Sequence, residues 1–494
     1  MCGIFGCILA SGVPPGCLAS IANDSLTALQ HRGTESSGLV GTSGKDNDHF
    51  DMVRGKGLVR DVFNEDVLKS TFNESIAILG HNRYSTAGMK DAINCVQPFV
   101  VHAVVGRVAI AHNGELVNVA SKRSEILKRG VGLSTDTDSE LIAQIISKAI
   151  ADHVRSDNSE LGDISKELET VMEEVDISYS LLVMTYDRIY AIRDRYGNRP
   201  LCIGTLRPGA NALKNAQNGS GQSAPFGYIV ASESCALPSF AKFDREVRPG
   251  EIVEITRTGI KERYRSARLP TPAFCIFEYV YFARSDSLFE GQQVHRVRRE
   301  CGMRLAKEAH IDADIVSTVP DSATAASHGY AQKSGIPYED VLYRNSYVGR
   351  SFIQPNTELR QSSITKKFGV LTQNVSGKRV VLVDDSIVRG NTMGIIVRLL
   401  KQHGAKEVHI RVASPPIVHP CFMGINIPDT KDLIAVNKSL EDIAAEFGAD
   451  SVQYLSVQGL KESVQRGIEA SKYPQVGHCM ACLTGEYPVD PYDF

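Results

Sequence analysis

Residues 380–392 read VVLVDDSIVRGNT, an apolar strand that runs into two aspartates, a short loop and the start of a helical pattern. Loops of this kind, at the carboxyl ends of parallel strands, are where α/β sheets bind their ligands. The backbone amides from Ser386 to Thr392 and the following helix N-terminus can hold a phosphate. Asp384 and Asp385 suit sugar hydroxyls or magnesium. The alternative is an ordinary strand-to-loop transition with solvated carboxylates.

The surrounding sequence repeats the same strand-then-helix alternation. Residues 313–322, 378–386 and 407–416 are apolar segments that end in polar residues, and residues 392–406 have the apolar spacing of a helix. This alternation predicts a mostly parallel sheet with helices between its strands. The C-terminal part of the chain is therefore predicted to be an α/β domain.

The N-terminal part has a different pattern. Short strands are predicted at 3–9, 108–116, 180–194, 227–234 and 251–259, and a helix at 139–154. The proline-containing stretch RLPTPAF, residues 268–274, is the candidate linker, so the chain is predicted to form two domains, 2–265 and 270–494. The polar, Gly- and Ser-rich residues 211–225 are predicted to be a surface insertion.

Composition excludes several classes of protein. The 494 residues carry a formal net charge of −3, which gives no basic footprint for nucleic acid. No apolar run is long enough to span a membrane, and the N-terminus has no signal-peptide pattern. Eleven cysteines at this low density are typical of a reducing compartment rather than of a secreted disulfide framework. The sequence therefore predicts a soluble, cytoplasmic protein.

The second residue is a cysteine, in the opening MCGIFG. Removal of Met1 alone would leave Cys2 with both a thiol and a free α-amino group, whose ordinary pKa is about 7.7–8.0. This combination pairs a nucleophile with a base near neutral pH. The alternative is a packing thiol on a buried first strand.

Four other motifs carry groups that a bound amino-acid amide would need. Arg83 in GHNRYSTAG can bind a carboxylate and Asp138 in STDTDSEL an ammonium group, while Asn113 and Gly114 in AHNGEL can donate to an oxyanion. Arg32 in QHRGTESSG is a further cation. Taken singly, each has an ordinary explanation as a surface ion pair, a helix cap or a turn residue.

The 380–392 stretch resembles the signature of the type I phosphoribosyltransferases, which use phosphoribosyl pyrophosphate (PRPP). The resemblance implies that STVPDSA, residues 317–323, is the pyrophosphate loop, with Asp321 and Ser322 near pyrophosphate and magnesium. It also implies that the Arg- and Lys-rich residues 343–371 are a loop that closes over PRPP, although the family commonly has lysine where Arg344 stands. The implied PRPP-binding residues are Asp384, Asp385, Ser386, Arg389, Gly390, Asn391, Thr392 and Arg344, and the implied magnesium ligands are Ser322, Asp384 and Asp385.

The N-terminal motifs, in this order and together with RDRYGNRPL at 193–201, resemble the class II (N-terminal nucleophile) glutamine amidotransferases. The resemblance implies an αββα layer domain in which Cys2 is the nucleophile, Asn113 and Gly114 complete the catalytic set, and Arg32, Arg83 and Asp138 bind glutamine. The two signatures in one chain resemble the glutamine PRPP amidotransferase family over essentially the whole length, outside residues 211–225. That family makes 5-phosphoribosylamine, glutamate and pyrophosphate from PRPP, glutamine and water, the first step of purine synthesis.

The motif HCMAC places Cys479 and Cys482 at metal-ligand spacing, and Cys275 and Cys421 could complete a four-thiolate site. Spacing alone leaves zinc, an iron–sulfur cluster and unrelated thiols open. These positions match the cluster ligands in the cluster-bearing branch of the family, which implies a structural [4Fe–4S] cluster. Family resemblance further implies a homo-oligomer, commonly a tetramer, and inhibition by purine nucleotides.

Two competing hypotheses remain at this point. A hexosamine-forming amidotransferase would share the N-terminal motifs but would send ammonia to fructose 6-phosphate. A PRPP-sensing repressor would share the C-terminal motif but would leave Cys2 without a role. The loop at 380–392 argues against the first, and the lack of a basic DNA-binding segment argues against the second.

Overall fold

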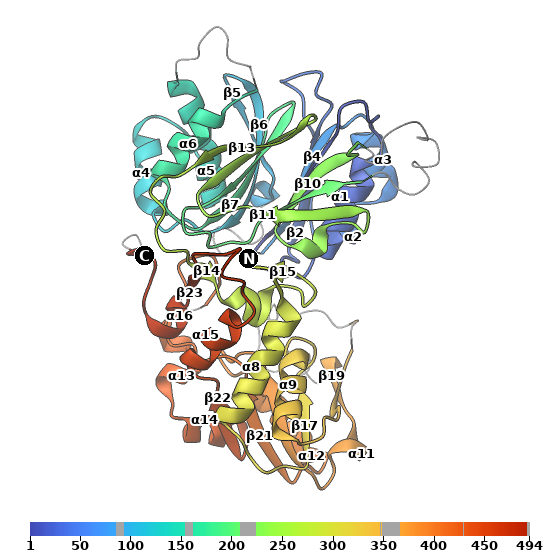
Figure 1. Ribbon diagram of the computed structural model, residues 1–494, viewed down its shortest axis with the longest axis vertical. Coiled ribbons are helices and arrows are strands. Elements are labelled where there is room, and N and C mark those ends of the chain that lie inside the picture. The colour runs from blue at the N-terminus through green and yellow to red at the C-terminus, as the bar shows by residue number, and fades with distance from the viewer. Residues whose placement is uncertain are drawn as a thin grey trace.

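The computed structural model describes residues 1–84, 93–153, 162–207, 224–345, 347, 366–427 and 429–491. Most of the predicted insertion at 211–225 and of the predicted loop at 343–371 lies outside the described residues. Figure 1 shows two halves stacked along the long axis, with the N-terminus at their junction. Both halves are mixed α/β structures, as the sequence predicted.

The first sheet has seven antiparallel strands in the order β11-β9-β10-β1-β4-β2-β3. These are β1 (Gly3–Leu9), β2 (Ser36–Thr42), β3 (Asp51–Lys56), β4 (Ala77–Arg83), β9 (Cys202–Leu206), β10 (Gly227–Ala231) and β11 (Ala241–Glu246). Strand β1 lies at its centre because both of its faces are apolar: Ile4 and Ile8 point to one side, and Phe5, Cys7 and Leu9 to the other.

The second sheet has six antiparallel strands in the order β13-β12-β8-β7-β6-β5. These are β5 (Phe99–Ala103), β6 (Gly106–Gly114), β7 (Tyr179–Met184), β8 (Arg188–Arg193), β12 (Glu251–Thr256) and β13 (Gly259–Arg265). The two sheets pack face to face around a shared apolar core that includes Ile8, Leu79, Leu182 and Val253.

Helices cover the outer face of each sheet (Figure 1). The first sheet is covered by α1 (Leu18–Ala28), α2 (Val59–Val62) and α3 (Glu65–Phe72), and the second by α4 (Val119–Lys128), α5 (Asp138–Asp152) and α6 (Ser165–Glu174). Helix α5 begins where the Thr137 hydroxyl accepts a hydrogen bond from the Glu140 amide at 3.3 Å. The result is the predicted helix–sheet–sheet–helix arrangement.

The C-terminal half is built on a four-stranded parallel sheet in the order β17-β20-β21-β22. The strands are β17 (Ile315–Thr318), β20 (Arg379–Asp384), β21 (Glu407–Val412) and β22 (Ser451–Tyr454). Helices α8 (Val294–Glu308), α9 (Thr324–Ser334) and α15 (Val457–Gln465) lie on one face, and α12 (Met393–Gln402) and α14 (Leu440–Phe447) on the other. Because all four strands are parallel, their carboxyl ends form one edge, which carries Asp384.

The two halves are joined through the segment that follows β13. It contains no helix or strand until β14 (Phe274–Cys275), which pairs in parallel with β23 (His478–Cys479) near the other end of the chain. The Cys275 amide donates to the Asn198 carbonyl at 3.1 Å, and the Asn198 side chain donates to the Ala273 carbonyl at 2.7 Å. The junction is therefore held by hydrogen bonds between distant parts of the chain.

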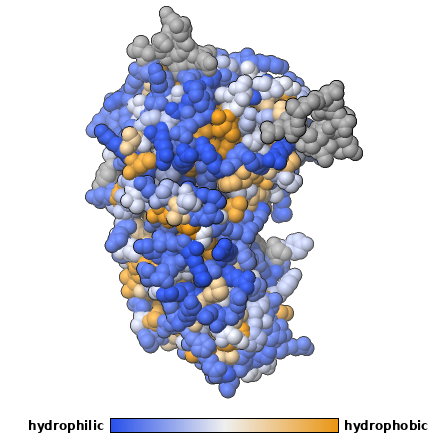
Figure 2. Space-filling view, viewed as in Figure 1, coloured by the Kyte–Doolittle hydropathy of each residue, from blue (hydrophilic) through white to orange (hydrophobic). Residues whose placement is uncertain are grey.

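Within the described residues, no helix combines the length and apolar character that crossing a membrane would require. Polar side chains cover most of the face shown in Figure 2, and apolar side chains form only scattered patches.

Candidate active sites

Cys2 lies directly before β1, where the two sheets of the N-terminal half meet. Its backbone nitrogen donates to Asn113 Oδ1 at 3.0 Å, and its sulfur lies 3.6 Å from the Tyr84 carbonyl oxygen. Only 9% of the residue is exposed. Asn113 belongs to β6, so the second sheet supplies the partner that holds this cysteine of the first. The structure therefore brings together Cys2 and the predicted Asn-Gly pair.

The side-chain amide of Asn113 has an unused donor. Its Nδ2 is buried and has no hydrogen-bond partner in the described part of the chain, whereas its Oδ1 is held by Cys2. Gly114 follows at φ +149°, and a Cβ there would lie 1.9 Å from the Ser178 carbonyl oxygen, so only glycine fits. A buried donor without a partner is costly unless a ligand accepts from it. Here a ligand acceptor would lie close to the Cys2 sulfur.

The two predicted ligands for an amino acid lie at the edges of the same site. Arg83 ends β4, one residue beyond the Gly3–Asn82 pair, so the register places it opposite Cys2. Asp138 is the first residue of α5, and its Oδ2 accepts from the Leu116 amide at 3.2 Å. Both side chains are almost completely buried.

The Arg32 side chain contacts the backbone of Cys2 and two buried carboxylates. Its Nε donates to the Cys2 carbonyl at 2.8 Å, and its terminal nitrogens donate to Glu278 at 2.9 Å and also to Glu233. Because the guanidinium group is 1% exposed and surrounded by these acceptors, it holds the backbone of Cys2 in place. Arg32 is thus a positioning residue for Cys2 in this structure, and its role as a glutamine ligand stays a prediction.

Glu233 also belongs to the group of described side chains, His31, Glu233 and Cys235, whose donor atoms lie within 4.8 Å of one another. Its carboxylate accepts from His31, Arg32 and Ser287. Burial would raise the pKa of Glu233, but the charges of His31 and Arg32 hold that pKa well below its usual range. Both oxygens are thus occupied next to a fixed cation, so we assign this group to the support of Arg32 and not to a metal.

Glu115, next to Gly114, has a raised pKa. Burial, reinforced by the charge of Asp138, raises the pKa of Glu115 to about 7, while a hydrogen bond from the Gly424 amide opposes the shift. The raised pKa means that folding favours the protonated form. The contribution of Glu115 to folding stability is therefore fully present below its unfolded-state pKa, near 4.5, and is lost as the pH rises through 7.

We therefore expect Glu115→Gln to flatten the fall in melting temperature between pH 5 and pH 8, because glutamine stays neutral while its oxygen can still accept from Gly424. Thermal unfolding at four pH values in this range measures the effect. Glu174→Gln, at an exposed position on α6, is the matched control and should follow the parent protein. Parallel curves for Glu115→Gln and the parent would contradict the assignment.

The second site lies at the carboxyl edge of the parallel sheet. Burial raises the pKa of both Asp384 and Asp385, and the pair interaction adds to the shift of Asp384. The Ser386 hydroxyl donates to Asp385 Oδ1 at 2.7 Å, and the Ser322 side chain hydrogen-bonds the same carboxyl. The structure thus brings the predicted pyrophosphate loop to the acidic pair.

The loop after the acidic pair is open to solvent and leads into α12. Gly390 has φ +76°, and a Cβ there would lie 2.6 Å from the Phe447 ring, so this turn also needs glycine. Thr392 stands at the N-cap of α12, where its side chain makes no capping hydrogen bond. Arg389 and Asn391 are exposed, and Arg389 lies 3.4 Å from Asp432. The helix N-terminus and the Thr392 hydroxyl therefore remain available to an anion.

Arg344 ends β18 (Leu342–Arg344), a short strand paired with β19 (Phe368–Val370). Its guanidinium group is bonded to Asp321, and its buried Nε has no partner among the described residues. Arg344 was predicted to bind PRPP and Asp321 to lie near pyrophosphate, and the structure brings these two residues together.

Buried charges also lie between the two sites. Arg298, on α8, donates to the carbonyls of Tyr279 and Ala283 at 2.7 and 2.8 Å. The same guanidinium interacts electrostatically with Asp385 in one site and with Glu233 and Glu278, the partners of Arg32, in the other. Sequence reasoning did not find these residues, because each lies in an apolar or helical segment with no motif of its own.

The four predicted cysteine ligands converge at the junction. Cys275 and Cys479 are opposite each other in the β14–β23 pair, and the Cys482 carbonyl accepts from the Val418 and His419 amides, close to Cys421. Burial is the main cause that raises the pKa of each thiol, to about 11 for Cys275 and about 12 for Cys479, and neighbouring thiols of the set add to the shift of Cys275, Cys479 and Cys482. All eleven cysteines are free of disulfides.

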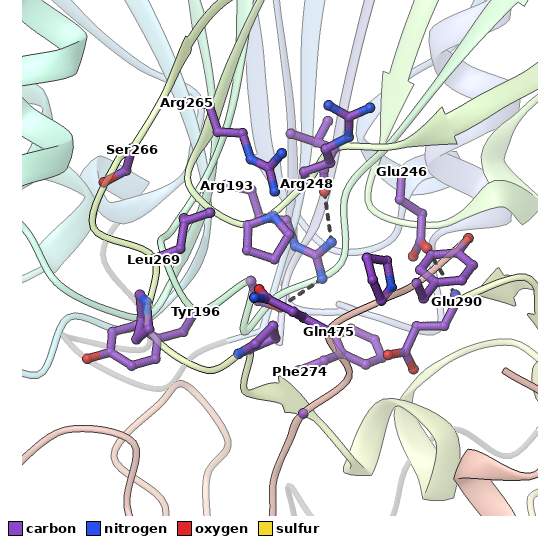
Figure 3. A pocket seen from close by; sticks show the side chains of 18 of the residues that line it. Arg193, Tyr196, Glu246, Arg248, Arg265, Ser266, Leu269, Phe274, Glu290 and Gln475 are labelled. Carbon is purple, nitrogen blue, oxygen red and sulfur yellow. Dashed lines mark hydrogen bonds between the residues drawn. The ribbon is translucent and has the colours of Figure 1, made fainter. Parts of the chain in front are cut away.

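A separate cavity of about 1120 Å³ lies between the linker, the β11–β12 turn and residues 471–477 (Figure 3). Two of its cations have several partners: Arg193 donates to the Arg199, Val247 and Gly197 carbonyls, and Arg245 forms a double ion pair with Glu251. This cavity holds none of the predicted catalytic residues.

Comparison with known proteins identifies the family. The family model of the glutamine amidotransferase domain matches residues 81–213, and that of the phosphoribosyl transferase domain matches residues 295–414. The amidophosphoribosyltransferase of Drosophila melanogaster is 52% identical over 99% of this chain and 89% of its own length, and that of Homo sapiens is 50% identical over 99% and 97%. The chain belongs to the amidophosphoribosyltransferase family.

Solved structures agree with this assignment. The glutamine PRPP amidotransferase from B. subtilis, complexed with ADP and GMP, has a TM-score of 0.82 and 37% identity over 99% of this chain and 98% of that one. A structure described as the allosteric regulatory enzyme of purine biosynthesis has a TM-score of 0.83, also at 37% identity, over 99% and 97%. The predicted fold and the predicted glutamine-dependent phosphoribosyltransferase class are confirmed. The similarity to amidophosphoribosyltransferases thus extends over both halves of the chain.

Proposed function

We propose that the amidophosphoribosyltransferase reaction runs in this chain as two half-reactions, one at each site described above. After removal of Met1, the Cys2 sulfur attacks the side-chain amide carbon of glutamine. The proton of the thiol moves through the α-amino group of Cys2 to the departing nitrogen, so that ammonia leaves and a thioester remains. Water then hydrolyses the thioester to glutamate and restores the thiol.

One observation carries this proposal: only one of the two polar atoms of the Asn113 side-chain amide has a hydrogen-bond partner within the described residues. Its Oδ1 holds the nitrogen of Cys2, and its buried Nδ2 has no partner in the described residues. This donor, together with the Gly114 amide, would stabilise the oxyanion that develops on glutamine. Arg83 and Asp138 would bind the carboxylate and the ammonium group of the substrate. A cysteine that only packed a strand would not need this arrangement.

The second half-reaction is proposed at the edge of the parallel sheet. The amides from Ser386 to Thr392 would hold the 5′-phosphate of PRPP, and Asp384 and Asp385 the ribose hydroxyls. Ammonia then bonds to C1 and pyrophosphate leaves, which gives 5-phosphoribosylamine. Ser322, Asp384 and Asp385 would hold magnesium, which would neutralise charge on the departing pyrophosphate. Two neighbouring buried carboxyls with raised pKa values fit a divalent cation, because its charge offsets their repulsion.

We further propose that residues 2–265 and 270–494 are the two functional domains, and that ammonia passes between them through a shielded path. The buried residues that connect Arg32 with Arg298 support this division, because they join the sites through protein rather than through solvent. A reducing cytoplasm suits eleven free cysteines. Feedback inhibition by purine nucleotides is proposed from the relative complexed with ADP and GMP, and a homo-oligomer, as a tetramer, from family resemblance.

Cys275, Cys421, Cys479 and Cys482 are proposed to hold a structural [4Fe–4S] cluster. A single zinc ion would need its sulfur ligands about 3.8 Å apart, from Zn–S bonds of about 2.3 Å. Among the described residues, no three of these sulfurs fall within 4.8 Å of one another, although their charges interact. The wider, all-thiol arrangement suits a cluster better than one ion. When bound, the cluster would tie β14 to the C-terminal segment.

The cluster assignment predicts about four irons per chain and a broad visible absorption band in protein purified without oxygen. Cys479→Ser should lose iron and lower the melting temperature, because the three remaining thiols then lack their shared ligand. Cys301→Ser, at a buried cysteine outside the set, should retain the iron. Stoichiometric zinc in colourless protein prepared without oxygen would contradict the assignment.

The overall function is tested by pyrophosphate release from PRPP in the presence of glutamine and magnesium. We expect release that requires both substrates. Activity with fructose 6-phosphate but not PRPP would instead establish a hexosamine-forming enzyme, and tight PRPP binding without any pyrophosphate release would favour a sensor.

A further inference from the structure

A segment of the C-terminal half, residues 421–424, reaches across the junction and contacts the glutamine site. Gly424 has φ +93°, and a Cβ there would lie 2.9 Å from the Gly114 carbonyl carbon, 3.1 Å from its oxygen and 3.2 Å from the Glu115 nitrogen. On its other side, Gly114 is against the Ser178 carbonyl, where a Cβ would lie 1.9 Å away. The Gly114 backbone is therefore held between two other stretches of backbone.

Further contacts hold this segment in place. The Gly424 amide donates to the Glu115 carboxyl, and Arg199 donates from one nitrogen to the Met423 carbonyl and from Nε to the Ser178 hydroxyl at 3.2 Å. Arg199 is fully buried, so these hydrogen bonds do not compete with water.

Apolar packing acts in the same direction. Met423 is 2% exposed and forms a small core with Val117 and Ile177, which follow Gly114 and precede Ser178 in their respective segments. The 421–424 segment is thus fixed to the segment that follows β6 and to the one that precedes β7, on either side of the Gly114 backbone.

We propose that Gly424 is a positioning residue for glutamine hydrolysis: the C-terminal half holds the Gly114 amide where the oxyanion forms. The inference rests on the proposed roles of Cys2, Asn113 and Gly114. An oxyanion donor acts only when it is within hydrogen-bonding distance of the developing charge, so a shift of a few tenths of an ångström weakens it. Residues 421–424 would then complete a site whose other members belong to the N-terminal half.

The test is Gly424→Ala in the full-length enzyme. The new methyl group must push the Gly114 backbone away, while Cys2 and the PRPP site keep their own contacts. We expect kcat for glutamine-dependent synthesis to fall about 10- to 100-fold, less than or equal to the loss typical of one oxyanion donor. Synthesis from added ammonia should remain at the parent rate, because ammonia needs no glutamine hydrolysis.

A third readout separates positioning from general damage. Alkylation of Cys2 by iodoacetamide, followed by mass spectrometry of the N-terminal peptide, requires the nucleophile but forms no oxyanion. Its rate should be unchanged in Gly424→Ala. The matched control is Gly335→Ala, which adds the same methyl group at φ +78° with nothing within 4 Å, and should leave all three rates unchanged.

Met423→Ala provides a second variant, because it loosens the segment without adding an atom beside Gly114. It should show the same division between glutamine and ammonia, by a few-fold, even if Gly424→Ala fails to fold. Parent-like kcat with glutamine in both folded variants, or equal losses of ammonia-dependent synthesis and alkylation, would overturn the proposal. If instead Cys2→Ala retained glutamine-dependent activity, the proposed function itself would fail, which makes the two failures distinguishable.

Discussion

Replacing Cys2 by alanine is expected to reduce glutamine-dependent synthesis of phosphoribosylamine to background while synthesis from added ammonia continues. The change removes the atom that forms the thioester, and loss of a catalytic nucleophile typically costs several orders of magnitude in kcat. Asp384, Asp385 and Thr392 are untouched in the other half of the molecule. Steady-state rates with glutamine and with ammonium chloride, both with PRPP and magnesium, measure the two activities.

Two controls sharpen this experiment. Cys7→Ala removes another buried thiol, five positions along the chain in the strand that Cys2 directly precedes, and should leave the ratio of the two rates unchanged. Retention of Met1 ahead of an intact Cys2 should reproduce the loss, since the α-amino base would then be an amide. The role of Cys2 is refuted if Cys2→Ala keeps its glutamine-dependent rate, or if both rates fall together in folded protein.

Replacing Asp384 or Asp385 by asparagine is expected to impair the PRPP site and to leave the glutamine site intact. Each substitution removes a negative charge from the proposed PRPP site, where losses of roughly 100-fold or more are typical for groups that stabilise the transition state. Synthesis should fall with both nitrogen sources, because both converge on the same ribose carbon. Alkylation of Cys2 by iodoacetamide should proceed at the parent rate.

The same two substitutions have a second measurable consequence. Burial raises the pKa of both carboxyls, so asparagine removes charges that folding does not favour, and the melting temperature should not fall. Asp450→Asn, at an exposed carboxyl paired with Lys401 on the opposite edge of the same sheet, is the control and should retain synthesis. Near-normal synthesis by either Asp384→Asn or Asp385→Asn would show that PRPP binds elsewhere.

The sequence was sufficient for the fold class, and it predicted those members of the two proposed sites that lie in contiguous motifs. In residues 380–392, strand, acidic pair, loop and helix follow one another directly, so local hydrophobic pattern and local chemistry predict the site together. The same holds for Asn113 and Gly114, which are adjacent in the sequence at the end of β6, and the structure explains why Gly114 must be glycine. The division into 2–265 and 270–494 stays a prediction.

Tertiary structure alone decided which charges surround Cys2. The sequence did not predict the ion pair of Arg32, because its partner Glu278 is 246 residues away in a segment with no motif of its own. The sequence did not point to Gly424 either, because glycine is required there only by close contact with the backbone of Gly114 in the other half. Sequence patterns report what each segment needs locally, whereas a buried ion pair or a contact between two backbones exists only once distant segments have packed together.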